Sequence, residues 1–265
     1  MSTERRAQTQ SLERGLGILQ AFRPEEPLLG ISDLARTLEL NRSTVHRYVA
    51  TLHRLGYLQQ DVATRKYRLG MRVLDLGFSA INSMELREIA APHLQALSDK
   101  TGHTVNMAIL DRADIVYIDR VRSPRPGQSQ IDLNLHVGAR LPAYCTSMGK
   151  VILAYLPEPA LEGVLDATEL IQRGPNTLTR RTCLLAELGR IRASGLAVNN
   201  EELAYGLRSI AVAVRTPGGE PVAAVNLAVH RSMVSMDDLI ARLGPVLRST
   251  AEEISRRIGH RSPVR

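Results

Sequence analysis

The segment NRSTVHRYVATLHRLG, which starts at Asn41, combines basic and hydroxyl side chains with no Asp or Glu. Val45, Val49 and Leu52 recur at the spacing of one helix face, and Gly56 suits the end of a helix. The opposite face then carries Arg, His and Ser side chains, whose donors and acceptors can read base edges or bind phosphates. The sequence therefore predicts a recognition helix whose first turn enters a DNA major groove.

Two short β-type stretches follow this helix, Tyr57–Gln60 and Tyr67–Leu69, and they enclose the turn DVATRK. The pattern predicts a hairpin with basic residues near its tip, placed to contact the DNA backbone or minor groove. The alternative is a basic helical hairpin with an ordinary solvated face. The residues expected to contact DNA are Asn41, Arg42, Ser43, Thr44, His46, Arg47, Arg65 and Lys66.

A second segment whose residues could bind a ligand is GARLPAYCTSMGK, residues 138–150, in which a loop leads into a helix. Exposed amide groups at a helix N-terminus favour an anion such as a carboxylate, so a small acid could bind beside Thr146 and Ser147. Arg140, upstream of this turn, could pair with such an acid, as could Arg120 and Arg208. Alternatively, Thr146 and Ser147 simply cap the helix and the following glycine permits close packing.

Cys145, near the start of the same helix, raises the question of nucleophilic catalysis. A reactive cysteine needs a lowered pKa or a neighbouring base, and no His lies near it in the sequence. The 2 cysteines and 7 histidines also lack the spacing of metal ligands. We therefore expect no enzyme activity, no metal and no cofactor.

The N-terminal elements must hold the recognition helix in place. Apolar residues from Leu12 to Phe22 predict a first helix, Ser32 would cap a short second helix, and Glu39–Asn41 indicates a tight turn before the recognition helix. Residues 71–83 predict a linker helix, and Leu86–Lys100 predicts a further helix that Pro92 interrupts early.

The rest of the chain alternates strand-like and helical segments. A loop is expected over Ser123–Gln130, and Pro217–Gly219 predicts the turn between the last two strands. The expected strands are Thr104–Leu110, Ile115–Val121, Ser209–Thr216 and Pro221–Val229, and the expected helices lie near Ser147–Leu156, Thr182–Ser194 and Ser235–Ile258.

Composition and charge are consistent with a two-domain protein that binds nucleic acid. The 265 residues are 44% hydrophobic and carry a formal charge of +7. The first 70 residues contain 11 basic and 7 acidic side chains, so more than half of the surplus lies in about a quarter of the chain. The polar first residues, and the lack of an apolar run of membrane-spanning length, predict a cytoplasmic protein that does not contact a membrane.

Four segments together resemble the IclR family of bacterial regulators: SLERGLGILQAF, ISDLARTLELNRSTVHRYVATLHRLGYL, KYRLGMRVLDLG and GARLPAYCTSMGKVILAYL. They occur in the family's order and span nearly the whole chain. LPAYCTSMGK resembles particularly the branch that controls aromatic-acid degradation through protocatechuate and β-ketoadipate. The resemblance implies a winged head, a linker helix and a GAF-like α/β effector domain, assembled as a dimer or tetramer.

The expected fold class is therefore α+β, with a winged helix-turn-helix over residues 1–70, a linker helix over 71–83 and an effector-binding, oligomerisation domain over 84–265. By resemblance, the effector pocket is lined by Ser147, Met148, Asn199, Ser209, Asn226 and Ala228. The further candidates for effector binding are Asn106, Arg140, Tyr144 and Thr146.

These features predict a transcription regulator that binds double-stranded operator DNA and senses a small organic acid. Because a symmetric oligomer presents paired heads, we expect a near-palindromic operator. Two alternatives remain at this point. One is a metabolic enzyme with a regulatory head, and the other is a DNA-binding architectural protein without a ligand.

Overall fold

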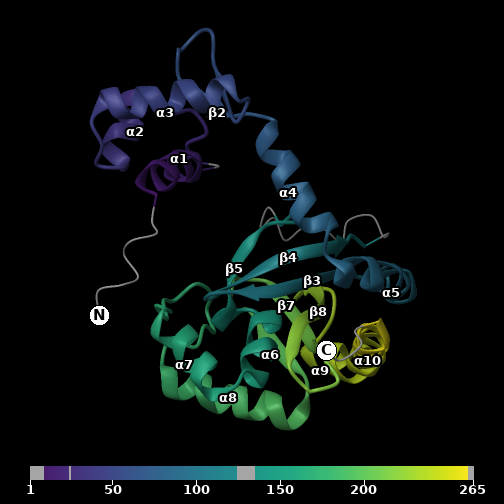
Figure 1. Ribbon diagram of the computed structural model, residues 1–265. Helices are drawn as coiled ribbons and strands as arrows, with labels where there is room; N and C mark the ends of the chain where they lie inside the picture. The colour runs from purple at the N-terminus through teal and green to yellow at the C-terminus, as the bar shows by residue number, and fades with distance from the viewer. Residues whose placement is uncertain (1–8, 24, 124–134, 262–265) are drawn as a thin grey trace. The chain divides into compact units, whose positions relative to one another are not determined.

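The computed structural model describes residues 9–23, 25–123 and 135–261 of the chain. It divides into two compact units, Met1–Ser83 and Met84–Arg265, which we describe separately (Figure 1). Residues 124–130 of the loop expected over Ser123–Gln130 lie outside the described residues. No helix in the described ranges is both long and apolar enough to cross a membrane.

The first unit is a helix-turn-helix followed by a β-hairpin. Its elements are α1 (Gln10–Gln20), α2 (Ile31–Thr37), α3 (Arg42–Arg54), β1 (Leu58–Gln60), β2 (Tyr67–Leu69) and α4 (Arg72–Asn82). A small apolar core joins them, with Ile18 of α1, Leu34 of α2, Val45 and Val49 of α3 and Leu58 of β1 almost fully buried. The apolar stripe of α3 is thus turned inward, as its sequence spacing predicts.

The second unit is built on one antiparallel sheet in the strand order β5-β4-β3-β8-β7-β6. The strands are β3 (Thr104–Asp111), β4 (Asp114–Val121), β5 (Arg140–Pro142), β6 (Ala197–Asn200), β7 (Leu207–Arg215) and β8 (Pro221–His230). The helices are α5 (Glu85–Thr101), the 3-10 turn η2 (Ala143–Cys145), α6 (Ser147–Tyr155), α7 (Glu158–Asp166), α8 (Arg181–Ser194), α9 (Met236–Asp238), the π-helical turn η3 (Leu239–Leu243) and α10 (Gly244–Arg261).

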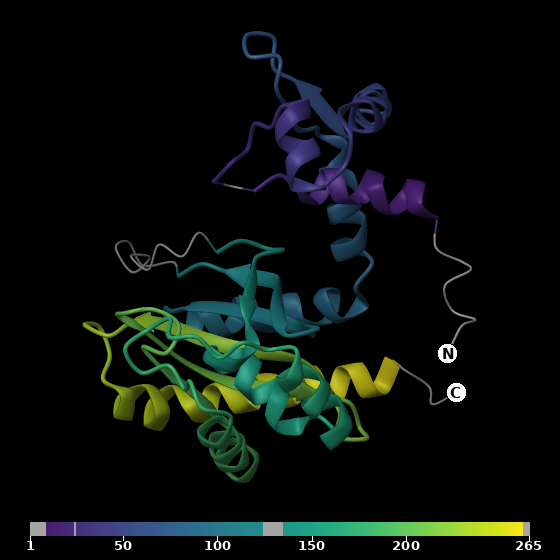
Figure 2. The ribbon, with the colours of Figure 1, turned by 90° about the vertical axis from the view of Figure 1, so that its left-hand side faces the viewer.

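Helices cover both faces of this sheet (Figure 2). On one face α5 and α10 pack against alternate strand residues such as Met107, Val212 and Val225. On the other face α6, α7 and α8 pack against Ala108, Ala211 and the residues in register with them. Because successive strand residues point to opposite faces, each strand contributes to both cores. We call the face toward α6 the inner face.

The fold class expected from the sequence, a winged helix-turn-helix with an α/β domain, is confirmed. The predicted turn at Pro217–Gly219 is present, with Gly219 at a φ of 87°. The predicted interruption at Pro92 is wrong, because α5 continues through this residue. Pro92 is exposed, so the hydrogen bond it lacks lies on the solvent side, while Ile89, Ala90 and Leu94 bury the opposite side of the helix.

Three short elements, β5, β6 and α7, had no counterpart in the sequence prediction. The helix expected over Ser235–Ile258 is also not uniform, since it comprises α9, η3 and α10. A strand of three or four residues is too short to show a recognisable alternation of apolar and polar residues. Strands β5 and β6 form here because a longer neighbouring strand pairs with each of them.

The start of α6 lies so close to η2 that only glycine fits at position 149. A Cβ on Gly149 would lie 2.2 Å from the carbonyl oxygen of Ala143, whereas one on Gly163 of α7 would meet nothing within 4 Å. We expect Gly149→Ala to lower the free energy of unfolding by about 3 kcal/mol, because backbone must move to relieve the overlap. Urea denaturation followed by circular dichroism measures the effect.

Gly163→Ala is the matched control, since it makes the same chemical change in a neighbouring helix. It should raise stability by about 0.5 to 1 kcal/mol, because alanine loses less backbone entropy on folding. Equal midpoints for the two variants would contradict the close approach of α6 to η2.

Candidate functional site

The first turn of α3 is fixed by its own capping residues. Oδ1 of Asn41 accepts a hydrogen bond from the backbone N–H of Thr44 at 2.8 Å and another from Oγ of Ser43 at 2.9 Å. These bonds satisfy a free amide at the helix N-terminus and hold the chain at the entry to α3. Asn41 and Ser43 therefore have a structural role, whether or not they also meet DNA.

Three basic side chains project from the solvent side of α3. Arg42, His46 and Arg47 are exposed, whereas Val45 and Val49 between and behind them are fully buried. Burial of the apolar stripe thus determines which residues of α3 remain accessible. The accessible surface is cationic and begins at the N-terminal turn, the part of a recognition helix that meets base edges.

The hairpin of β1 and β2 carries the other two residues expected at DNA. Asp61 closes its turn by accepting hydrogen bonds from the backbone N–H and hydroxyl of Thr64, which lower the pKa of this carboxyl. Arg65 follows in the left-handed region, at a φ of 61°, and is exposed. Lys66 instead reaches back to α2, where its Nζ lies 3.7 Å from Oδ2 of Asp33.

In the second unit, polar side chains gather on the inner face of the sheet. Asn106 of β3 is in register with Asn226 of β8, and Ser209 of β7 is in register with Asn199 of β6. All four lie on the α6 side and are at most 5% exposed. Strand register therefore brings together residues that are up to 120 positions apart in the sequence.

Arg120 of β4 extends this polar row. Its Nη1 donates to Oδ1 of Asn106 at 2.7 Å, and Nδ2 of Asn106 donates to Oδ1 of Asn226 at 2.7 Å. Its Nε is buried and has no hydrogen-bond partner among the described residues. Burial lowers the pKa of this guanidinium, and within the same residues no Asp or Glu forms an ion pair with it.

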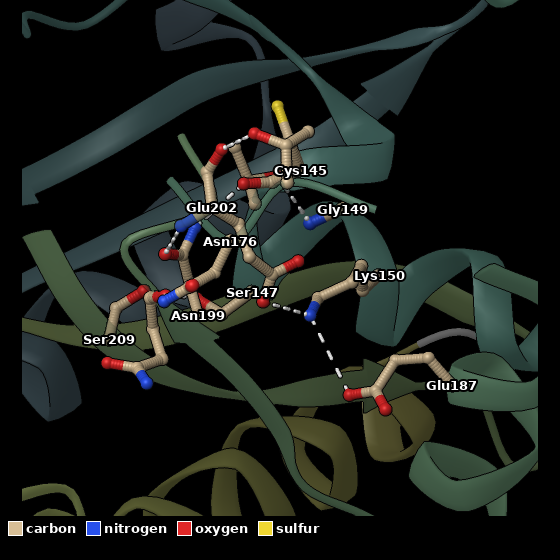
Figure 3. A network of polar contacts seen from close by, with 12 residues as sticks. Cys145, Ser147, Gly149, Lys150, Asn176, Glu187, Asn199, Glu202 and Ser209 are labelled. Carbon is tan, nitrogen blue, oxygen red and sulfur yellow. Dashed lines mark hydrogen bonds and ion pairs between the residues drawn. The ribbon is translucent and has the colours of Figure 1, made fainter. Parts of the chain in front are cut away.

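The N-terminus of α6 meets the same face through two hydrogen bonds, and a third caps the helix itself (Figure 3). Oγ of Ser147 lies 2.7 Å from Oγ of Ser209, and Nδ2 of Asn199 donates to the carbonyl oxygen of Cys145 at 2.7 Å. Oγ1 of Thr146 accepts from the N–H of Gly149 at 3.1 Å and caps the helix. The structural role expected for Thr146 is thus present, and Ser147 turns toward the sheet.

A buried ion pair lies one turn further along α6. The Nζ of Lys150 is 2.6 Å from Oε1 of Glu202 and 3.7 Å from Oε1 of Glu187 (Figure 3). Burial raises the pKa of Glu202 more than Lys150 lowers it, and its Oε2 has no hydrogen-bond partner in the described chain. Sequence analysis did not single out this pair, because its two members are 52 residues apart.

The remaining effector candidates are placed differently. Met148 and Tyr144 are buried in the apolar core, although the hydroxyl of Tyr144 donates to the carbonyl of Ile171. Ala228 borders the polar row, in register with Ser209. Arg140 does not join the row, because its guanidinium is exposed and pairs with Asp111 and Asp114 at the far end of β4.

The surroundings of Cys145 disfavour a reactive thiolate. Burial raises its pKa to about 11, so the thiol is protonated near neutral pH. The described residues also contain no group of three or more His, Cys, Asp or Glu side chains arranged to hold a metal ion.

Comparisons with known proteins agree with this architecture. Residues 11–62 match the model of the IclR helix-turn-helix domain, and residues 78–256 match that of the bacterial transcriptional regulator IclR C-terminal domain. The chain is 37% identical to the Pca regulon regulatory protein of Pseudomonas putida over 92% of its own length and 82% of that protein.

Two solved structures illustrate the likeness of the fold. A crystal structure from Rhodococcus sp. RHA1 is 39% identical and has a TM-score of 0.82, with 96% of this chain and all of that chain covered. An IclR homolog from Microbacterium hydrocarbonoxydans, crystallised with 4-hydroxybenzoate, is 24% identical and has a TM-score of 0.78 over 95% of this chain and 100% of that one. With both domains matched in order and over most of its length, the chain belongs to the IclR family of bacterial transcriptional regulators.

Proposed function

We propose that this regulator responds to a small organic acid from aromatic catabolism, and that the acid binds on the inner face of the sheet between Arg120 and the N-terminus of α6. Residues 11–62 supply the DNA-binding domain and the C-terminal domain supplies the effector site. Acid binding would change the affinity for operator DNA through the coupling of two distinct sites.

The observation that carries this proposal is the guanidinium of Arg120, with which no carboxylate of the described residues forms an ion pair. A partly buried cation is costly unless a counter-charge or hydrogen bonds compensate it, and here one nitrogen, Nε, is buried with no hydrogen-bond partner in the part of the chain that the structure describes. A carboxylate is the group that best completes such a site, because it can accept two parallel hydrogen bonds from the guanidinium.

The surrounding residues suit the rest of a small acid. Ser147, Ser209 and Asn226 offer hydroxyl and amide groups, and the adjoining alanines of β7 and β8, buried against α6, supply small apolar neighbours for a ring. In the ligand-free chain these polar groups bond to one another, so the acid would exchange existing hydrogen bonds for its own.

The relatives support an aromatic acid in particular. The Pseudomonas putida relative is named for the Pca regulon, and the Microbacterium hydrocarbonoxydans homolog was crystallised with 4-hydroxybenzoate. We therefore propose 4-hydroxybenzoate and related acids as the first compounds to test.

We further propose that the protein acts as a dimer or tetramer on a near-palindromic operator. A single DNA-binding domain buries few side chains and presents one recognition helix. Two such domains are therefore needed to bind both half-sites of an operator at once. In this proposal α4 connects the DNA-binding and effector domains, and we expect DNA contacts from Arg42, His46, Arg47 and Arg65.

The acid site is tested by Arg120→Gln. Loss of the charged hydrogen bonds should weaken binding of the acid by about 1.5 to 3 kcal/mol, which corresponds to roughly 10- to 150-fold in Kd. Isothermal titration calorimetry with 4-hydroxybenzoate measures this change. Arg140→Gln is the matched control, because Arg140 is held by two aspartates outside the polar row, and it should leave the Kd unchanged. Equal effects of both substitutions would contradict the proposed position of the acid.

Ser147→Trp tests the coupling between the acid and DNA. The indole should break the contact of Ser147 with Ser209 and occupy the proposed acid site, so acid binding should disappear while operator affinity without acid stays the same. Fluorescence anisotropy of labelled operator DNA, with and without the acid, gives both quantities, and circular dichroism verifies the fold. If the variant keeps the wild-type response to the acid, the acid binds elsewhere.

The recognition helix is tested by Arg42→Ala and Arg47→Ala. Each should weaken operator binding by about 1 to 3 kcal/mol if the side chain reads a base, or reduce the salt dependence by one phosphate contact. Arg257→Ala on α10 removes the same charge from the effector domain and serves as control. Unchanged affinity and salt dependence in both α3 variants would exclude α3 from the recognition role.

A further inference from the structure

A cavity of about 560 Å³ lies at the edge of the sheet, away from the polar row. It forms because β6 pairs with β7 only as far as Ala197 opposite Ala211, whereas β7 continues to Arg215. The chain before β6 turns away at Gly195, the left-handed residue that ends α8. The uncovered end of β7 therefore forms one wall, and α10 and the end of α6 form the others.

The lining of this cavity is strongly cationic. Arg248, Glu252 and Arg256 follow one another at four-residue intervals on α10, so they share one side of the helix, and Arg215 approaches from the end of β7. Arg256 already pairs with Glu253. Among the described residues, no carboxylate forms an ion pair with Arg215 or Arg248.

Both unpaired guanidinium groups are oriented by their neighbours. Arg215 lies over the ring of Tyr155, with Cζ 4.7 Å from the ring centroid. Arg248 lies against the backbone of Gly195, where an added Cβ would be only 2.8 Å from its Nη1. Stacking and close packing restrict these long side chains before any ligand arrives, which reduces the entropy lost on binding.

We propose that this cavity is a second ligand site, which binds a small molecule carrying two negative charges. Arginine binds carboxylate and phosphate oxygens through paired N–H groups, and two unpaired arginines on different elements can each take one anionic group. None of the residues that form the polar row around Arg120 lines this cavity. The site is therefore separate from the proposed acid site, and a ligand here would bridge β7 and α10.

Calorimetric titration of the full chain tests the proposal with pyrophosphate and malonate as probes, and with acetate as the singly charged comparison. We expect at least one dianion to bind at one site per chain, at least tenfold more tightly than acetate. Tighter binding of pyrophosphate would assign the site to phosphate groups, and tighter binding of malonate would assign it to paired carboxylates. Binding of neither dianion, or of acetate equally well, would overturn the proposal.

Variants of the lining locate the site. Arg248→Ala and Arg215→Ala should each weaken dianion binding at least tenfold, and Arg215 lies at an exposed strand end, where truncation spares the core. Glu252→Gln should tighten binding severalfold, because it removes the one acidic side chain of the lining. Arg257→Ala removes a neighbouring charge of α10 outside the cavity and should have no effect.

Two further results would overturn the assignment. An equal loss in Arg257→Ala would indicate attraction by the general surface charge, and loss of dianion binding in Arg120→Gln would place the probe in the polar row instead. Retained binding in Arg120→Gln, together with loss in Arg248→Ala, would place the dianion in this cavity and outside the polar row.

Discussion

Lys150 and Glu202 are both buried where they meet, between α6 and the segment after β6. Buried charges are tolerated only when they are compensated, and removing Lys150 would leave Glu202 without its cation at a cost of roughly 3 to 5 kcal/mol. Through this pair α6 is tied to the edge of the sheet. Asn199 strengthens the connection, since its side chain accepts from the N–H of Glu202 and donates to the carbonyl of Cys145. The position of Ser147 over Ser209 follows from this attachment.

The two units place their polar groups in opposite ways. On α3 the apolar side is buried and the cationic side is left to solvent, which suits a large polyanion that approaches from outside. On the inner face of the sheet, polar groups are enclosed and bond to one another, which suits a small ligand that must displace those bonds. The same elementary rule, that a buried polar atom needs a partner, therefore gives an exposed cationic surface in one unit and an enclosed polar row in the other.

The sequence predicted the elements whose signal is local. The stripe of Val45 and Val49 and the cap at Asn41 lie within a few residues of each other, and the structure confirms the helix they define. The candidate site was predictable only in part. Asn106 and Asn226 came from resemblance and residue type, but their contact depends on the register of β3 with β8. Lys150 looks like an ordinary surface lysine in the sequence, and only tertiary packing makes it 1% exposed. The sequence does not distinguish Arg140 from Arg120, whereas the structure does, because Asp111 and Asp114 form ion pairs with Arg140.

The helix α4 buries none of its side chains in the described structure, although Leu74, Leu76 and Phe78 are large and apolar. An isolated helix of 11 residues is only marginally stable in water, so the stability of α4 depends on contacts beyond its own backbone hydrogen bonds. Unwinding would lengthen this connection from about 16 Å to about 36 Å, given the rise per residue of helical and extended chain. The length of chain that joins the two domains therefore depends on whether α4 stays helical, and a partner that covers Leu74, Leu76 and Phe78 would favour the shorter, helical form.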